Sequence, residues 1–139
     1  MSYKFLEHTA DIKIEAEAPS LEGAFSETAS ALKEVISGDI VVLSQIKKEI
    51  NVKGKDLQSL LYNFLEEFLF LLDSESFLLW KVEDVKIDEK NFTLKASLIG
   101  DNAENYHFTN DVKAVTYNDM RIDFDEKKKS WKIHVVLDV

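Results

Sequence analysis

The sequence contains no cysteine, one proline and four glycines among its 139 residues. The lack of cysteine excludes disulfides, thiolate catalysis, zinc fingers and iron–sulfur clusters. Long hydrophobic runs are also lacking, because Asn63, Glu66 and Glu67 interrupt the most apolar stretch, residues 60–73. That stretch is too short and too polar to span a bilayer. The opening MSYKFLEH has no apolar core of a secretory signal peptide, so we expect a cytoplasmic protein with no membrane partner.

Basic residues are scarce relative to acidic ones. The 17 Lys and Arg against 26 Asp and Glu give a formal charge of −9. A protein that binds a phosphate backbone unaided normally presents a basic face. The dense basic run Lys127-Lys128-Lys129 follows acids in DFDEKKK, a pattern typical of a solvated hairpin turn. The charge therefore disfavours direct RNA binding and favours action through a basic protein partner or a metal ion.

Apolar residues are plentiful, at 45% of the chain with nine phenylalanines, which is enough for a hydrophobic core. Without a linker or repeat, this length predicts one domain over residues 1–139. Apolar positions three and four residues apart predict two helices, which begin after the capping residues Ser20 and Asp56. The apolar surface of the second helix, residues 57–75, is wide. It indicates a central helix covered by sheet or, alternatively, a groove for a partner.

The remaining segments predict strands. They lie at residues 3–7, 11–18, 40–43, 46–52, 77–88, 91–100, 111–117, 120–125 and 131–139. Residues 100–111 read as a long loop without core residues of its own. This order predicts an α+β fold, a mostly antiparallel β-sheet packed with two main helices.

Two strand ends carry candidate metal ligands. Asp11 begins one predicted strand, and Asp138 lies on the polar face of the last strand, next to Val139. Hard divalent cations prefer carboxylate and carbonyl oxygens, so these groups and an oxygen of Val139, if brought together, could form a calcium- or magnesium-like site. The alternative, which the residues alone favour, is that Asp11 is a turn residue and Asp138 a solvated strand end.

Three further residues border these aspartates in the sequence or share a strand's polar face. His8 could ligate a metal or hydrogen-bond to Asp11 and orient it, and Thr9 could cap the turn with its hydroxyl. Lys113 is expected on the polar side of its strand, either as an exposed lysine or as a phosphate contact. No nucleophile–base pair, glycine-rich phosphate loop or acid–base pair of carboxylates emerges, so the chemistry predicts no enzyme.

Several motifs together resemble the archease family along the whole chain: FLEHTADI near the start, SLEGAF and LLDSE in the helices, VKAVTY, and the final VVLDV. The resemblance implies that the aspartate of HTAD, the aspartate of the final LDV and the last residue hold a metal. In this sequence these are Asp11, Asp138 and Val139, with calcium the expected ion and magnesium or manganese as alternatives. Many family members carry a histidine where this chain has Asn118, so no role is assigned there.

The resemblance also implies a function. Archease-like proteins assist the GTP-dependent RNA-splicing ligase that joins tRNA exon halves, promoting guanylylation of the ligase and its repeated turnover. The expected partner is therefore that ligase, and tRNA would be met only indirectly through it. Two other classes stay open: a metal-stabilised module that binds a small ligand or protein, and a metal-dependent hydrolase acting through Asp11 and His8.

Overall fold

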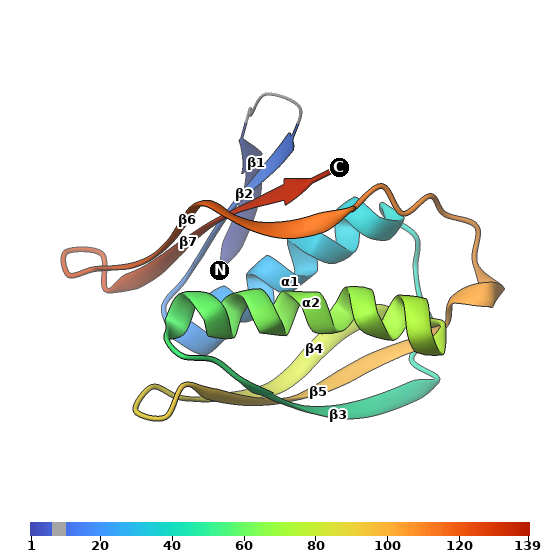
Figure 1. The fold of residues 1–139 in the computed structure, drawn as a ribbon, viewed down its shortest axis with the longest axis horizontal. Helices are drawn as coiled ribbons and strands as arrows, with labels where there is room; N and C mark the ends of the chain where they lie inside the picture. The colour runs from blue at the N-terminus through green and yellow to red at the C-terminus, as the bar shows by residue number, and fades with distance from the viewer. Residues whose placement is uncertain (7–10) are drawn as a thin grey trace.

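Two antiparallel sheets enclose a layer of two helices (Figure 1). The computed structural model describes residues 1–6 and 11–139. The first sheet has the strand order β1-β2-β7-β6 and the second has the order β3-β5-β4. Each helix contacts strands of both sheets. The predicted α+β class, with two main helices and mostly antiparallel strands, is confirmed.

The elements have the following bounds. The first sheet contains β1 (Ser2–Leu6), β2 (Asp11–Ala18), β6 (Ala114–Asp125) and β7 (Ser130–Asp138); the second contains β3 (Ile46–Lys53), β4 (Phe77–Asp88) and β5 (Thr93–Asn102); the helices are α1 (Leu21–Ser37), α2 (Leu57–Glu75) and the short 3₁₀ helix η1 (Ala103–Asn105).

Both helices begin at the predicted caps. The Ser20 side chain accepts a hydrogen bond from the Gly23 backbone N–H at 3.0 Å, which satisfies one free donor of α1. Asp56 accepts one from the Ser59 backbone N–H at 2.7 Å, and the Ser59 hydroxyl accepts one from the Asp56 N–H at 3.1 Å. This reciprocal pair is a capping box, so α2 begins at Leu57.

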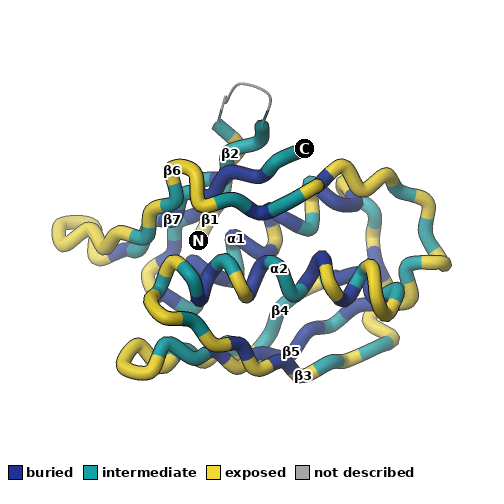
Figure 2. Tube along the Cα trace, viewed as in Figure 1, coloured by how far each residue is buried: buried dark blue, intermediate teal, exposed yellow. Residues whose placement is uncertain are grey.

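The wide apolar surface of α2 is mainly core. Leu61 and Phe64 are fully buried, and Phe64 packs against Phe25 of α1 with ring centroids 5.8 Å apart. Phe70 is the large exposed apolar residue on this helix. Figure 2 shows buried residues on both helices and on the strands that face them. The structure therefore favours the central-helix interpretation over the partner groove.

No helix in the described part of the chain is long and apolar enough to cross a membrane.

Three strand predictions need correction. Residues 40–43 form no strand, because the connection to β3 follows an irregular path in which Val42 is buried and Ile40 packs against the core, while Val41 and Leu43 are exposed. Residues 111–117 and 120–125 do not form separate strands. They contribute to the single strand β6, which bends where its pairing with β7 shifts register between Thr116 and Arg121.

The loop that follows β5 does contribute to the core, contrary to expectation. Tyr106 and Phe108 pack against the core cluster. The Tyr106 hydroxyl donates to the buried Asp101 carboxylate at 2.6 Å and accepts a hydrogen bond from the Leu43 backbone N–H at 2.9 Å. Periodicity could not reveal this, because the loop is anchored by single side chains rather than by an amphipathic stripe.

Candidate functional site

The register between β2 and β7 places Asp11 directly opposite Asp138. On its other side, Asp138 is opposite Ala114 of β6. Directly opposed residues of an antiparallel pair have Cβ atoms about 4.5–5.5 Å apart and project on the same face. The two aspartates that the sequence assigned to distant segments are thus neighbours, both half-buried at one end of the sheet.

This arrangement fits a divalent cation in its donor chemistry. Two carboxylates directly opposite each other repel, and a cation between them would remove that cost. Calcium and magnesium both prefer such hard oxygen donors. In residues 1–6 and 11–139, no group of three His, Asp or Glu side chains is placed to hold an ion. The predicted ligand set is smaller, with two carboxylates and an oxygen of Val139, so ion binding stays a prediction.

A hollow of about 880 Å³ lies next to Asp11. Its lining residues come from the end of β1, the start of β2, the last turns of α1, the segment before β6 and the residue after β7. Its lining residues are Phe5, Leu6, Asp11, Ile12, Glu34, Val35, Asn110, Asp111, Lys113 and Val139. We call this feature the tip hollow. It brings together three predicted residues, Asp11, Lys113 and Val139.

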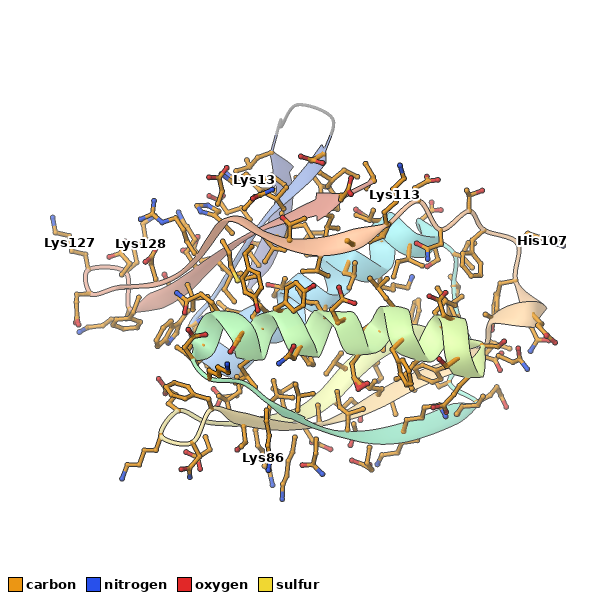
Figure 3. All side chains as sticks on the ribbon, in the orientation of Figure 1. Lys13, Lys86, His107, Lys113, Lys127 and Lys128 are labelled. Atoms are coloured by element: carbon orange, nitrogen blue, oxygen red, sulfur yellow. The ribbon has the colours of Figure 1, made fainter. Side chains whose placement is uncertain are left out.

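Lys113 is exposed and borders the tip hollow. Its backbone N–H donates to the Asp138 carbonyl oxygen at 2.7 Å, which fixes it beside the candidate site. Figure 3 shows its side chain at the start of β6, close to the chain end. The buried inward position of β6 is Val115, whereas Ala114 lies opposite Asp138 on the outer side. Lys113 itself precedes β6, and its role at the tip hollow stays a prediction.

The other site residues fall into two groups, those predicted from the sequence and those that the fold adds. His8 and Thr9 lie outside the described residues. Sequence reasoning missed Glu34, Asn110 and Asp111, which the fold brings to the tip hollow. The signal available for the last two was their position as polar neighbours just before Lys113. Nothing local indicated Glu34, because it reaches the hollow only through the packing of α1.

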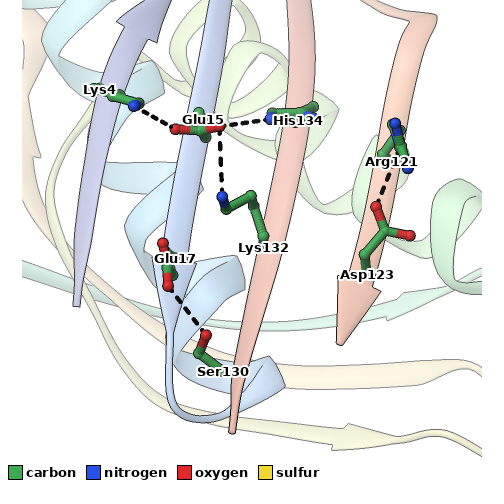
Figure 4. Close-up of polar contacts among 8 residues, drawn as sticks. All are labelled: Lys4, Glu15, Glu17, Arg121, Asp123, Ser130, Lys132 and His134. Carbon is green, nitrogen blue, oxygen red and sulfur yellow. Dashed lines mark hydrogen bonds and ion pairs between the residues drawn. The ribbon is translucent and has the colours of Figure 1, made fainter. Parts of the chain in front are cut away.

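A charged network covers the outer face of the same sheet (Figure 4). The Glu15 carboxylate accepts a hydrogen bond from His134 Nε2 at 2.8 Å and pairs with Lys4 Nζ at 2.9 Å and Lys132 Nζ at 3.9 Å. Hydrogen bonds from His134 and then Lys4 lower the pKa of the Glu15 carboxyl from its usual 4.5 to about 2. These contacts link β1, β2 and β7. Glu15 lies two side chains beyond Asp11 on the same face of β2.

The basic run sits far from the candidate site. Lys127 and Lys128 lie at the exposed tip of the β6–β7 hairpin (Figure 3), where their backbone N–H groups donate to the Asp125 carboxylate at 2.9 and 3.2 Å. The predicted solvated turn is confirmed.

Comparison with known proteins identifies the family. The family model described as the Archease protein family (MTH1598/TM1083) matches residues 3–139. The solution structure of protein 1598 from Methanobacterium thermoautotrophicum superimposes with a TM-score of 0.82 at 34% identity, covering 99% of this chain and 98% of that one.

Curated relatives agree with this match. "Protein archease" of Methanosarcina mazei is 34% identical, covering 99% of this chain and 95% of the relative. "Protein archease" of Pyrococcus abyssi is 43% identical over 87% of both chains, and "Protein archease-like" of Drosophila melanogaster is 35% identical over 100% of this chain and 91% of the relative. Because the likeness extends over nearly the whole length in sequence and in fold, the chain belongs to the archease family.

Proposed function

We propose that this protein is an accessory factor of the GTP-dependent RNA-splicing ligase that joins tRNA exon halves in the cytoplasm. It promotes guanylylation of the ligase and its repeated turnover. Family membership supports the assignment. The observation that carries it is the direct opposition of Asp11 and Asp138 at one end of the sheet, beside Val139 and Lys113.

Asp11, Asp138 and an oxygen of Val139 are the groups that would hold the divalent ion. Calcium accepts oxygen ligands in a flexible coordination geometry, and magnesium or manganese are the alternatives. When bound, the ion supplies a positive centre that attracts phosphate oxygens. Lys113 borders the same hollow and offers an ammonium group to a phosphate. His8, which precedes Asp11 in the HTAD motif, would orient that carboxylate.

The charge of the whole chain supports a protein partner. At −9, the molecule is attracted to an enzyme with a basic RNA-binding surface, and electrostatic steering speeds such encounters. The same charge repels RNA, so contact with tRNA would pass through the ligase. The protein itself then needs no catalytic group, which is why we propose an accessory factor rather than an enzyme.

A ligation assay tests this proposal. The ligase is used at a small fraction of the RNA concentration, with and without this protein. We expect many turnovers per ligase with the wild-type chain and loss of that stimulation with Asp11→Ala or Asp138→Ala. Asp123→Ala is a matched control, because it removes one carboxylate from the same sheet where Asp123 pairs with Arg121 at 3.1 Å, away from the tip hollow.

The outcomes separate the alternatives. No stimulation by the wild-type chain would contradict the proposed function, and a calcium-dependent rise in Tm in that case would support the metal-stabilised binding module. Turnover of RNA or nucleotide by the isolated protein would support the hydrolase. Full stimulation by both aspartate variants would leave the ligase role in place and remove the aspartates from it.

A further inference from the structure

The tip hollow has an apolar wall that a metal site does not require. Its residues come from three elements: Phe5 and Leu6 of β1, Ile12 of β2 and Val35 of α1, with Val139 following β7. Phe5 is 41% exposed, although it lies opposite the fully buried Ile14 and so on the inner face of its sheet. Five apolar side chains grouped around one hollow of about 880 Å³ form a contiguous apolar surface, and such surfaces mark contact sites.

The rim of the hollow is acidic. Among the lining residues that the structure describes, Asp11, Glu34 and Asp111 carry carboxylates and Lys113 carries an ammonium. Glu34 and Asp111 are exposed. Glu34 accepts a long hydrogen bond from the Tyr3 hydroxyl at 3.4 Å, and Asp111 forms no ion pair within residues 1–6 and 11–139. Glu34 and Asp111 thus place exposed negative charge at the rim, within reach of a partner.

We propose that the tip hollow is the docking site for a basic segment of the ligase that inserts one apolar side chain. The apolar side chain packs on Phe5 and Val35, and a neighbouring Lys or Arg of the ligase pairs with Glu34 or Asp111. This inference rests on the proposed function and adds the contact that holds the ligase.

Charge complementarity selects this occupant. A second copy of the chain would bring another molecule of charge −9, and an RNA strand would bring phosphates, and both are repelled by the rim. A small apolar ligand would fill the wall but leave the carboxylates unused. An apolar anchor in a pocket with paired charges at its edge is the usual arrangement of a strong contact between proteins.

The geometry also separates docking from activation. Asp138 lies opposite Asp11 but does not line the tip hollow, whereas Phe5 and Asp111 line it from β1 and from the segment before β6. Changes at Phe5 or Asp111 should therefore alter the affinity for the ligase, and changes at Asp138 should alter the stimulation reached once the ligase is saturated.

The test measures the Kd for the purified ligase, without RNA, by fluorescence anisotropy of the labelled protein. We expect Phe5→Ser to weaken binding at least about 10-fold, as truncation of a central anchor does. Asp111→Lys should weaken binding and make it less dependent on salt. The matched controls are Phe124→Ser, 40% exposed near the β6–β7 turn, and Glu126→Lys in that turn, and both should bind within about two-fold of wild type.

Two further measurements separate lost binding from lost folding. The Tm of every variant is recorded. If Phe5→Ser is poorly folded, Phe5→Leu, which keeps an apolar side chain, should still bind the ligase. A photo-crosslinking amino acid at position 5 should label a ligase peptide that contains Lys or Arg beside an apolar residue.

Three other experimental outcomes would each contradict the proposed docking site. Wild-type affinity in both Phe5→Ser and Asp111→Lys, with stimulation still lost in Asp138→Ala, contradicts the docking site and leaves the proposed function standing. Crosslinking to a second copy of the chain also contradicts it. A wild-type chain that neither binds nor stimulates the ligase overturns the proposed function and the docking site together.

Discussion

At the scale of single residues, Asp11 and Asp138 show how strand pairing creates a candidate site. Each is an ordinary strand-end aspartate in the sequence, and antiparallel register makes them direct neighbours. Like charges in that position destabilise a sheet by roughly 0.2–1 kcal/mol. This opposition is the feature on which the proposed cation site rests.

The first prediction follows from this pairing. Calcium should raise the Tm of the wild-type protein, because an ion that binds only the folded state stabilises it by about 2.7 kcal/mol at 100 times its Kd. In Asp11→Asn and Asp138→Asn the rise should be absent, since each removes one charged ligand and keeps the side-chain size. Thermal melts in calcium and in EDTA measure this. An equal rise in all three proteins would show that the ion binds elsewhere.

Glu15 gives a second prediction, on acid stability. Its pKa of about 2 in the folded protein is below the usual 4.5, so the contacts with His134 and Lys4 stabilise the fold fully above pH 4.5. That stabilisation is lost as the pH falls from 4.5 to about 2, because the carboxylate must then be protonated.

Glu15→Gln should therefore lower the free energy of unfolding at pH 7 by about 1.5–3 kcal/mol, the usual contribution of a hydrogen bond to a charged group. It should also flatten the fall in stability below pH 4.5. Urea unfolding at pH 7, 4 and 3 measures both effects. Glu17→Gln is the control, because Glu17 lies on the same strand face and accepts a hydrogen bond from the Ser130 hydroxyl at 3.0 Å. Identical pH profiles for wild type and Glu15→Gln would contradict the assignment.

At the scale of elements, α2 connects the two sheets and should dominate stability. Leu61→Ala should cost about 2–5 kcal/mol of the free energy of unfolding, because Leu61 is fully buried and its loss leaves a cavity. Phe70→Ala on the same helix should change stability by only about 0.5 kcal/mol or less, because Phe70 is 56% exposed. Chemical denaturation of both variants decides this, and equal costs would mean that Phe70 is covered in solution.

The elements also show which sequence signals are reliable. Both helices could be predicted because caps and apolar spacing agree at Ser20 and Asp56. The structure of residues 40–43 could not be predicted, because four apolar residues in a row do not specify a strand unless a neighbouring strand pairs with them. The sequence predicts two separate strands in place of β6, because the polar residues between Thr116 and Arg121 resemble a turn.

At the scale of the whole molecule, the candidate site was only partly predictable. The ends of β2 and β7 could be identified from alternation, but their pairing depends on the strand order of the sheet, which no local pattern contains. The inward position at the start of β6 is Val115, opposite Leu137, because pairing with β7 sets the phase of that strand. Glu34 entered the tip hollow only through the packing of α1 against the first sheet.

The position of the two chain ends gives the last prediction. Val139 borders the tip hollow beside Asp138, whereas Ser2 pairs with Glu17 at the end of the β1–β2 pair far from Asp11. A tag fused after Val139 would alter its oxygen donors and crowd the tip, and calcium sites lose affinity when ligand geometry is disturbed. A tag before Met1 would project from the distant end.

We therefore expect the carboxy-terminal tag to weaken both the calcium-dependent rise in Tm and the stimulation of the ligase, and the amino-terminal tag to leave both near wild type. The same tag sequence is used at either end, and cleaving the carboxy-terminal tag back to Val139 should restore both readouts, because the tip is then open again. Equal behaviour of the two tagged proteins would place Val139 outside the site, and Asp11 and Asp138 would then have to bind the ion without it.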